Sequence, residues 1–137
     1  MTQEEKQLLL KDLCARLPYG VKIHINSCIE EQNQMQLYDV TLEGETIGVK
    51  NEKWAFRAIP IIDDEDETKV IRPYLRPMSS MTDAEKEEYS NTFVYKDGFK
   101  MATSNSVDFL NSHYIDYRGL IPMNLALEAP EDMYKNE

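Results

Sequence analysis

The sequence predicts an α+β fold in one domain over residues 1–137, with an antiparallel sheet of three to five strands and about three helices packed on one face. Three observations predict this class. Helix-start motifs occur near residues 2 and 82, apolar and polar residues alternate over 21–27, and the apolar residues of 36–50 mirror one another about a central turn.

Length and composition agree with a folded domain. With 137 residues, of which 42% are hydrophobic, the chain can bury roughly two thirds of the surface that its unfolded form exposes. A chain of this kind is not expected to need a disulfide or a metal in order to fold.

The first helix is expected over residues 3–17. Thr2 and Glu5 form a capping box, in which each side chain satisfies a free backbone amide at the helix start. Leucines and Cys14 recur at helical spacing, so the Cys14 thiol is expected on the inner face, and Pro18 ends the run.

The next segments predict strands. Residues 21–27 alternate strictly, and His24 falls on the polar face of that strand. Residues 36–50 predict a hairpin with a two-residue turn at Glu43 and Gly44. Val40 should then lie opposite Ile47, and Tyr38 opposite Val49.

A further strand is expected in "KWAFRAIPII", with Trp54, Phe56 and Ala58 on one face and Pro60 confining it to a sheet edge or a strand end. The acidic run 63–67 follows. It lacks the central glycine and closing glutamate of a calcium loop, so we interpret it as a solvated turn.

The second half predicts an extended, proline-rich segment followed by two helices. Thr82 and Glu85 form a second capping box, which opens a short acidic helix. A third helix is expected after a cap at Ser104 or Ser106. Its apolar side is expected to hold Val107, Leu110 and Tyr114, and residues 118–137 should form a turn and an ordered C-terminal hook.

The charge balance limits the classes of partner. The chain has 15 Lys and Arg against 25 Asp and Glu, a formal charge of −10. This charge disfavours direct binding to nucleic acid or to a membrane, although it permits an acidic mimic of DNA. The N-terminus carries acidic residues where an export signal has basic ones, so we expect a cytoplasmic protein with reduced cysteines.

The first candidate site is the pair Arg72 and Arg76 with Tyr74 between them. Four residues apart on an extended segment, the two guanidinium groups leave the same side and could hold a phosphate or carboxylate. The alternative is that these arginines neutralise acidic side chains of the protein itself.

The second candidate site is "NSHYIDYRG", which contains His113, Asp116, Tyr117 and Arg118. A His–Asp pair can act as a base and its orienting group, but here it lacks a nucleophile or a metal. In the structural interpretation, Arg118 donates to free carbonyls at the end of the third helix and Asp116 neutralises its charge.

Motifs for particular chemistries are missing from the sequence. There is no GxSxG, GxGxxG or GxxxxGK, and two histidines with two distant cysteines do not form a metal-ligand pattern. We therefore expect no catalytic residue, no metal and no cofactor.

Three stretches, "RPYLRPMSSMTDAEK", "FLNSHYIDYRGLIPMNLALEAPEDMY" and "LLLKDLCARLPYGVK", resemble segments of a family of small proteins encoded by gut anaerobic bacteria and their phages and prophages. The resemblance covers about half of the chain. It implies a mobile-element accessory protein and carries no activity, cofactor or site residue with it.

These observations favour a non-enzymatic interaction protein that binds a protein partner. Two alternatives stay open: a small-ligand binder or enzyme that uses His113, Asp116 and the arginines, and an acidic inhibitor that mimics DNA.

Overall fold

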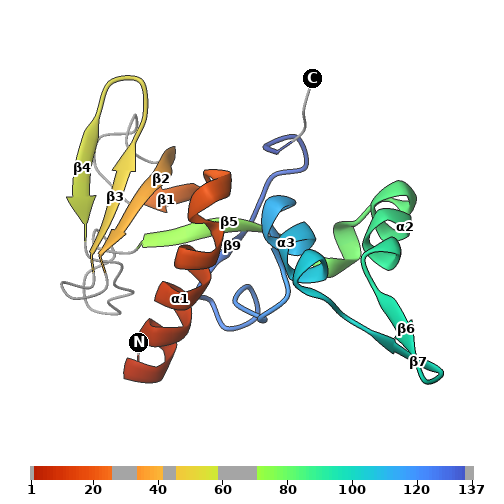
Figure 1. Ribbon diagram of the computed structural model, residues 1–137. Helices are drawn as coiled ribbons and strands as arrows, with labels where there is room; N and C mark the ends of the chain where they lie inside the picture. The colour runs from red at the N-terminus through yellow and green to blue at the C-terminus, as the bar shows by residue number, and fades with distance from the viewer. Residues whose placement is uncertain (1, 26–33, 42–45, 59–70, 135–137) are drawn as a thin grey trace.

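The computed structural model describes residues 2–25, 34–41, 46–58 and 71–134 (Figure 1). The first half holds α1 (Gln3–Arg16), a 3-10 turn η1 (Leu17–Tyr19), β1 (Lys22–Ile25), β2 (Gln34–Thr41), β3 (Thr46–Lys50) and β4 (Ala55–Ala58). The second half holds β5 (Ile71–Pro77), a 3-10 turn η4 (Met78–Ser80), α2 (Asp83–Asn91), β6 (Val94–Lys96), β7 (Phe99–Met101), α3 (Ser104–Ser112), β8 (Ile115–Asp116) and β9 (Leu127–Glu128).

The α+β class is confirmed, but the expected sheet was too small. In the described part of the chain, seven strands form one sheet in the order β4-β3-β2-β1-β5-β8, with β9 also pairing with β5. β8 and β9 run parallel to β5, so the sheet is mostly but not wholly antiparallel. Each has only two residues, which is too short for a periodic pattern in the sequence.

The β2–β3 hairpin confirms one predicted pair and corrects the other. Val40 lies opposite Ile47, as predicted, whereas Val49 lies opposite Leu37 instead of Tyr38. A bulge at Tyr38 shifts the register. The Tyr38 ring lies over Gly48, where a Cβ atom would stand 2.8 Å from the tyrosine Cζ. The turn at 43–44 lies outside the described residues.

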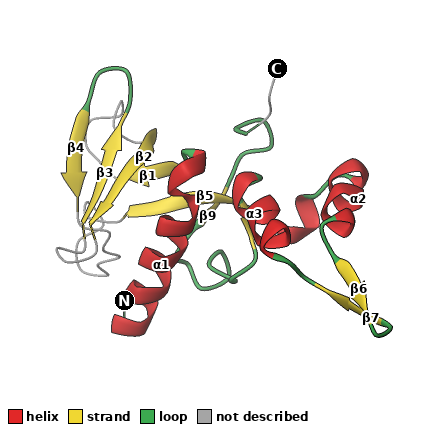
Figure 2. Cartoon of the chain, viewed as in Figure 1, coloured by secondary structure: helices red, strands yellow, loops and turns green. Residues whose placement is uncertain are grey.

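α1 packs its apolar side against one face of the sheet (Figure 2). The capping box of Thr2 and Glu5 is present, and the helix buries Leu9 and Leu13 in a core shared with β1, β2, β3 and β5. Cys14 is only partly buried, and this burial raises the pKa of its thiol. α1 therefore supplies the main cover of the sheet.

The other two helices depart further from the predictions. The capping box of Thr82 and Glu85 is present, but α2 has no buried residue and packs on α3 rather than on the sheet. The N-cap of α3 is Thr103, not Ser104 or Ser106, and Val107 is exposed. The Thr103 backbone N–H donates to Ser106 Oγ at 3.0 Å, which pulls the start of the helix back by one residue.

β4 begins two residues later than predicted, at Ala55 instead of Lys53. Trp54 precedes the strand and is exposed, because its backbone N–H and that of Lys53 donate to the Asn51 side chain in a tight turn. Phe56 does pack on the core. Pro60 and the acidic run 63–67 lie outside the described residues.

The β6–β7 hairpin (Val94–Met101) was not among the predicted elements. Asp97 and Gly98, both with positive φ, form its two-residue turn. The hairpin projects away from the main sheet beyond α2 and α3 (Figure 1).

In the part of the chain that the structure describes, no helix is long and apolar enough to cross a membrane.

Candidate functional site

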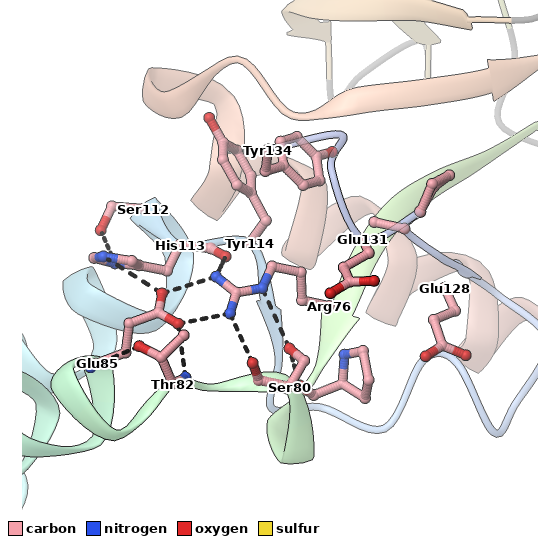
Figure 3. Close-up of a pocket in the computed structure, with 13 residues that line it drawn as sticks. Arg76, Ser80, Thr82, Glu85, Ser112, His113, Tyr114, Glu128, Glu131 and Tyr134 are labelled. Carbon is pink, nitrogen blue, oxygen red and sulfur yellow. Dashed lines mark hydrogen bonds and ion pairs between the residues drawn. The ribbon is translucent and has the colours of Figure 1, made fainter. Parts of the chain in front are cut away.

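A cavity lies where β5 ends, between the starts of η4 and α2, the end of α3 and the C-terminal segment 128–134 (Figure 3). Its volume is about 880 Å³. We call it the β5–α3 pocket. It brings together two of the predicted site residues, Arg76 and His113.

Arg76 is fully engaged within the protein. Its Nη1 and Nη2 donate to the two Glu85 carboxylate oxygens at 2.8 and 2.7 Å. The remaining N–H groups donate to Ser80 Oγ at 3.2 Å, to the Ser80 carbonyl at 3.1 Å and to the His113 carbonyl at 3.4 Å. A guanidinium has five N–H donors, so Arg76 has none left for an anionic ligand.

Glu85 completes this structural tie. Besides Arg76, it accepts a hydrogen bond from the Thr82 backbone N–H at 2.9 Å, which is half of the capping box of α2. The Arg76 guanidinium and the Thr82 amide lower the pKa of the Glu85 carboxyl to about 2. The pair therefore joins the end of β5 to the start of α2.

His113 has one ring nitrogen that makes no hydrogen bond to the described residues. Its Nδ1 lies 2.9 Å from the Phe109 carbonyl, which can only accept, so the Nδ1 atom carries the proton. The other ring nitrogen, Nε2, stands 4.0 Å from Glu85 Oε2, too far for a hydrogen bond. Nε2 thus makes no hydrogen bond to the described residues and lies within ion-pair distance of the Glu85 carboxylate.

The serines beside His113 are not arranged for nucleophilic catalysis. Ser80 Oγ donates to the Pro77 carbonyl at 2.7 Å, and Ser112 Oγ donates to the Phe109 carbonyl at 3.0 Å. Ser112 also lies on the Nδ1 side of His113, where the imidazole carries its proton. Neither hydroxyl faces the basic nitrogen that would have to activate it.

Two tyrosines form the wall opposite α2. The rings of Tyr114 and Tyr134 stack with centroids 3.8 Å apart. Tyr134 Oη accepts from the Lys22 backbone N–H at 2.9 Å and donates to the Tyr74 carbonyl at 2.8 Å. Burial raises the pKa of both phenols, so they stay neutral and act as structural groups.

The pocket is therefore suited to binding a hydrogen-bond donor. Its lining has one arginine against three glutamates, a formal charge of −2 with His113 neutral. The described residues contain no group of three or more His, Cys, Asp or Glu side chains placed to hold a metal. A cationic organic group fits these observations better than an anion or a metal.

The other predicted site residues lie elsewhere. Arg72 donates from Nε to the Asn124 carbonyl at 3.0 Å, and the Tyr74 hydroxyl lies 3.0 Å from His24 Nδ1. The two arginines of the first candidate site are thus held by different partners and do not converge on one ligand.

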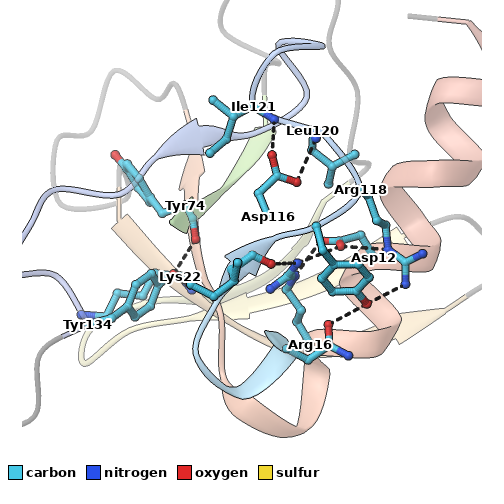
Figure 4. A network of polar contacts seen from close by, with 12 residues as sticks. Asp12, Arg16, Lys22, Tyr74, Asp116, Arg118, Leu120, Ile121 and Tyr134 are labelled. Atoms are coloured by element: carbon cyan, nitrogen blue, oxygen red, sulfur yellow. Dashed lines mark hydrogen bonds and ion pairs between the residues drawn. The ribbon is translucent and has the colours of Figure 1, made fainter. Parts of the chain in front are cut away.

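The predicted pairing of Asp116 with Arg118 is wrong. Asp116 accepts from the backbone N–H groups of Leu120 and Ile121, each at 2.9 Å, and so caps the turn that follows (Figure 4). Arg118 donates instead to Asp12 of α1 at 3.1 Å. Sequence proximity suggested a local pair, but the carboxylate that neutralises Arg118 lies 106 residues away.

Asp12, Arg16, Tyr117 and Arg118 form what we call the Asp12 network (Figure 4). The side chains of Asp12 and Arg16 are completely buried and bond at 2.8 Å, and Arg16 also donates to the Ile115 carbonyl. Tyr117 lies beneath both guanidinium groups and accepts from Arg118. The four-residue spacing of Asp12 and Arg16 signalled an ion pair on a helix, but not its burial.

A second candidate site is the apolar surface of the β6–β7 hairpin. The exposed fractions are 50% for Val94, 75% for Tyr95, 72% for Phe99 and 49% for Met101. No residue of the two strands is buried.

Comparisons with protein-family models, with curated proteins and with solved structures found no match.

Proposed function

We propose that this chain is a small, cytoplasmic, non-enzymatic accessory protein that binds a protein partner through the β6–β7 hairpin. The observation that carries the proposal is the exposure of large apolar side chains on one projecting element, of which Val94, Phe99 and Met101 share a face and Tyr95 lies on the other. The resemblance to proteins of phages and prophages supports an accessory role, and the engaged serines of the pocket argue against hydrolysis.

The hairpin is fastened at its base and open towards its tip. Thr103 Oγ1 donates to the Thr92 carbonyl at 2.8 Å. Lys100 Nζ donates to Ser90 Oγ at 3.0 Å and lies 4.9 Å from the centre of the Phe93 ring. These contacts hold the two strands on α2 and α3. An isolated two-stranded hairpin would be only marginally stable in water, so the contacts with the helices stabilise this one.

The register sorts the hairpin side chains into two faces. Val94 pairs with Met101, and Lys96 pairs with Phe99, so these four share one face. Apolar surface that is contiguous and exposed marks interaction sites in monomeric proteins. A fitting partner offers an apolar groove with a carboxylate near Lys96.

The test is affinity capture from a bacterial lysate with three immobilised proteins: the wild type, a Phe99→Ser/Met101→Ser variant and a Trp54→Ser control. Trp54 is an exposed aromatic residue directly before β4, an edge strand of the main sheet. We expect a protein that the wild type and the control retain and the hairpin variant loses. Equal retention by all three would contradict the proposal, and competition by duplex DNA would instead favour the DNA-mimic alternative.

A second candidate function is binding of a cationic small molecule in the β5–α3 pocket. Two observations favour it. All N–H groups of Arg76 are hydrogen-bonded within the protein, so they do not attract an anion, and His113 Nε2 makes no hydrogen bond to the described residues. Calorimetric titration with arginine or spermidine tests it. Binding by the wild type that a Glu128→Gln variant weakens severalfold would support this function, whereas no heat of binding in the wild type would exclude it for these ligands.

A further inference from the structure

A groove on the sheet face away from α1 has a charge opposite to that of the whole chain. It spans the outer sides of β1, β2 and β3, and has a volume of about 720 Å³. Lys22, Lys50 and Lys53 line it against one acidic residue, Glu52, which gives a formal charge of +2 in a chain of charge −10. We call it the lysine groove.

Strand register places two of these lysines around one glutamine. Lys22 lies directly opposite Gln36, and Gln36 lies directly opposite Lys50. Directly opposite residues project to the same face, and neighbouring strands lie about 4.8 Å apart, so the two lysine backbones are about 10 Å apart. Their side chains are long enough to reach a common group held between them.

Aromatic rings position both ammonium groups without neutralising them. Lys22 Nζ lies 6.0 Å from the centre of the Tyr134 ring, and Lys50 Nζ lies 5.7 Å from that of Tyr38. Lys22 Nζ also makes a long hydrogen bond of 3.4 Å to the Met133 carbonyl. Neither lysine pairs with a carboxylate in the ranges that the structure describes. A cation held by a ring keeps its full charge for a ligand.

Between the lysines, the exposed Gln36 side chain extends over Gly20. A Cβ atom at position 20 would stand 2.5 Å from Gln36 Nε2, so a larger residue there would require this amide to shift. Gly20 also has φ +65°, a conformation that glycine adopts without strain. The middle of the groove therefore has a polar amide next to the two cations.

We propose that the lysine groove binds a phosphate dianion, free or as a phosphomonoester, between Lys22 and Lys50. Lysine ammonium groups bind phosphate as point charges and do not require the planar geometry that a guanidinium imposes. A dianion matches two cations, whereas a single carboxylate would leave one of them without a partner. The inference is independent of the β6–β7 hairpin.

The test is a titration of the ¹⁵N-labelled protein with inorganic phosphate, followed by amide chemical shifts at low ionic strength. We expect saturable shifts centred on Lys22, Gln36 and Lys50. The Lys22→Gln/Lys50→Gln variant should bind at least tenfold more weakly, and Lys86→Gln, on exposed α2, should bind like the wild type. Lys50→Gln alone serves as the variant if the double substitution impairs folding.

Titrations with two other anions distinguish the possible ligands. Glycerol phosphate binding more tightly than inorganic phosphate would assign the groove to phosphomonoesters, and the reverse order would assign it to the free ion. Acetate at the same ionic strength should cause no saturable shift. Linear shifts scattered over the surface, equal effects of acetate, or equal weakening by Lys86→Gln would overturn the proposal.

Discussion

Asp12 and Arg16 have no exposed surface, whereas Tyr95 and Phe99 expose about three quarters of theirs, 75% and 72%. The Asp12 network joins α1 to the segment after α3, using charged residues that are 106 positions apart in the chain. The β6–β7 hairpin is local in sequence and contributes nothing to the core. The difference indicates that the polar cluster stabilises the fold and that the apolar hairpin is the part available for binding.

The largest effect is expected for Asp12→Ala. This change leaves the guanidinium groups of Arg16 and Arg118 without their shared carboxylate, and breaking a buried ion pair costs about 3 to 5 kcal/mol. Arg118→Ala should cost less, because the Asp12–Arg16 pair remains balanced. Unfolding in urea measures both values, and an Asp12→Ala cost below about 1 kcal/mol would contradict the role of the network.

A pH-dependent effect is expected for Glu85→Gln. The folded carboxyl has a pKa of about 2 against an ordinary value of 4.5, so it stabilises the protein above pH 4.5 and loses this contribution as the pH falls towards 2. At pH 7 the free energy of unfolding of the variant should be lower by about 2 to 3 kcal/mol. This value is an upper limit, because Glu85 is slightly exposed and solvent weakens its interaction with Arg76. Urea midpoints of the two proteins should converge between pH 4.5 and pH 2. A constant difference across that interval would show that Arg76 does not cause the stabilisation.

Tyr134→Phe should have a smaller effect. It removes the hydroxyl that accepts a hydrogen bond from the Lys22 backbone N–H and donates one to the Tyr74 carbonyl. A buried backbone group left without a hydrogen bond costs about 1 to 3 kcal/mol. Tyr95→Phe is the matched control, because that side chain is exposed. Thermal unfolding measures both variants, and equal melting temperatures would show that the C-terminal segment does not stabilise the sheet through this group.

The smallest effect on stability is expected in the hairpin itself. Phe99→Ser should change the free energy of unfolding by no more than about 0.5 kcal/mol, because surface substitutions away from the core rarely do more. The same change should reduce capture of the partner. A large loss of stability would instead assign the hairpin to the packed part of the molecule.

Local signals in the sequence predicted local structure well. Thr2 and Thr82 each precede a glutamate at capping-box spacing, and both helices begin where the motif indicates. The Val40–Ile47 pair followed from matching apolar residues across a turn. The β6–β7 hairpin had an equally clear signal that was not used, since Asp-Gly between short apolar segments is typical of a two-residue turn.

Long-range structure could not be predicted in the same way. The ion pair of Arg118 with Asp12 depends on where α1 packs, which no pattern near Arg118 encodes. The parallel pairing of β8 and β9 with β5 likewise depends on the path of the C-terminal segment. In the candidate site, the sequence indicated Arg76 and His113, but not that Glu85 would take up the donors of Arg76.

Amide hydrogen exchange, with and without a captured partner, most directly tests the separation between a stabilising network and a binding hairpin. In the free protein, we expect the amides of Leu120 and Ile121, which bond to buried Asp116, to exchange only through global unfolding. Amides of β6 and β7 should exchange at least a hundredfold faster and should gain the most protection when the partner binds. Two results would contradict the account. One is equal protection of the hairpin amides and of the Leu120 and Ile121 amides in the free protein. The other is protection by the partner that appears only outside the hairpin.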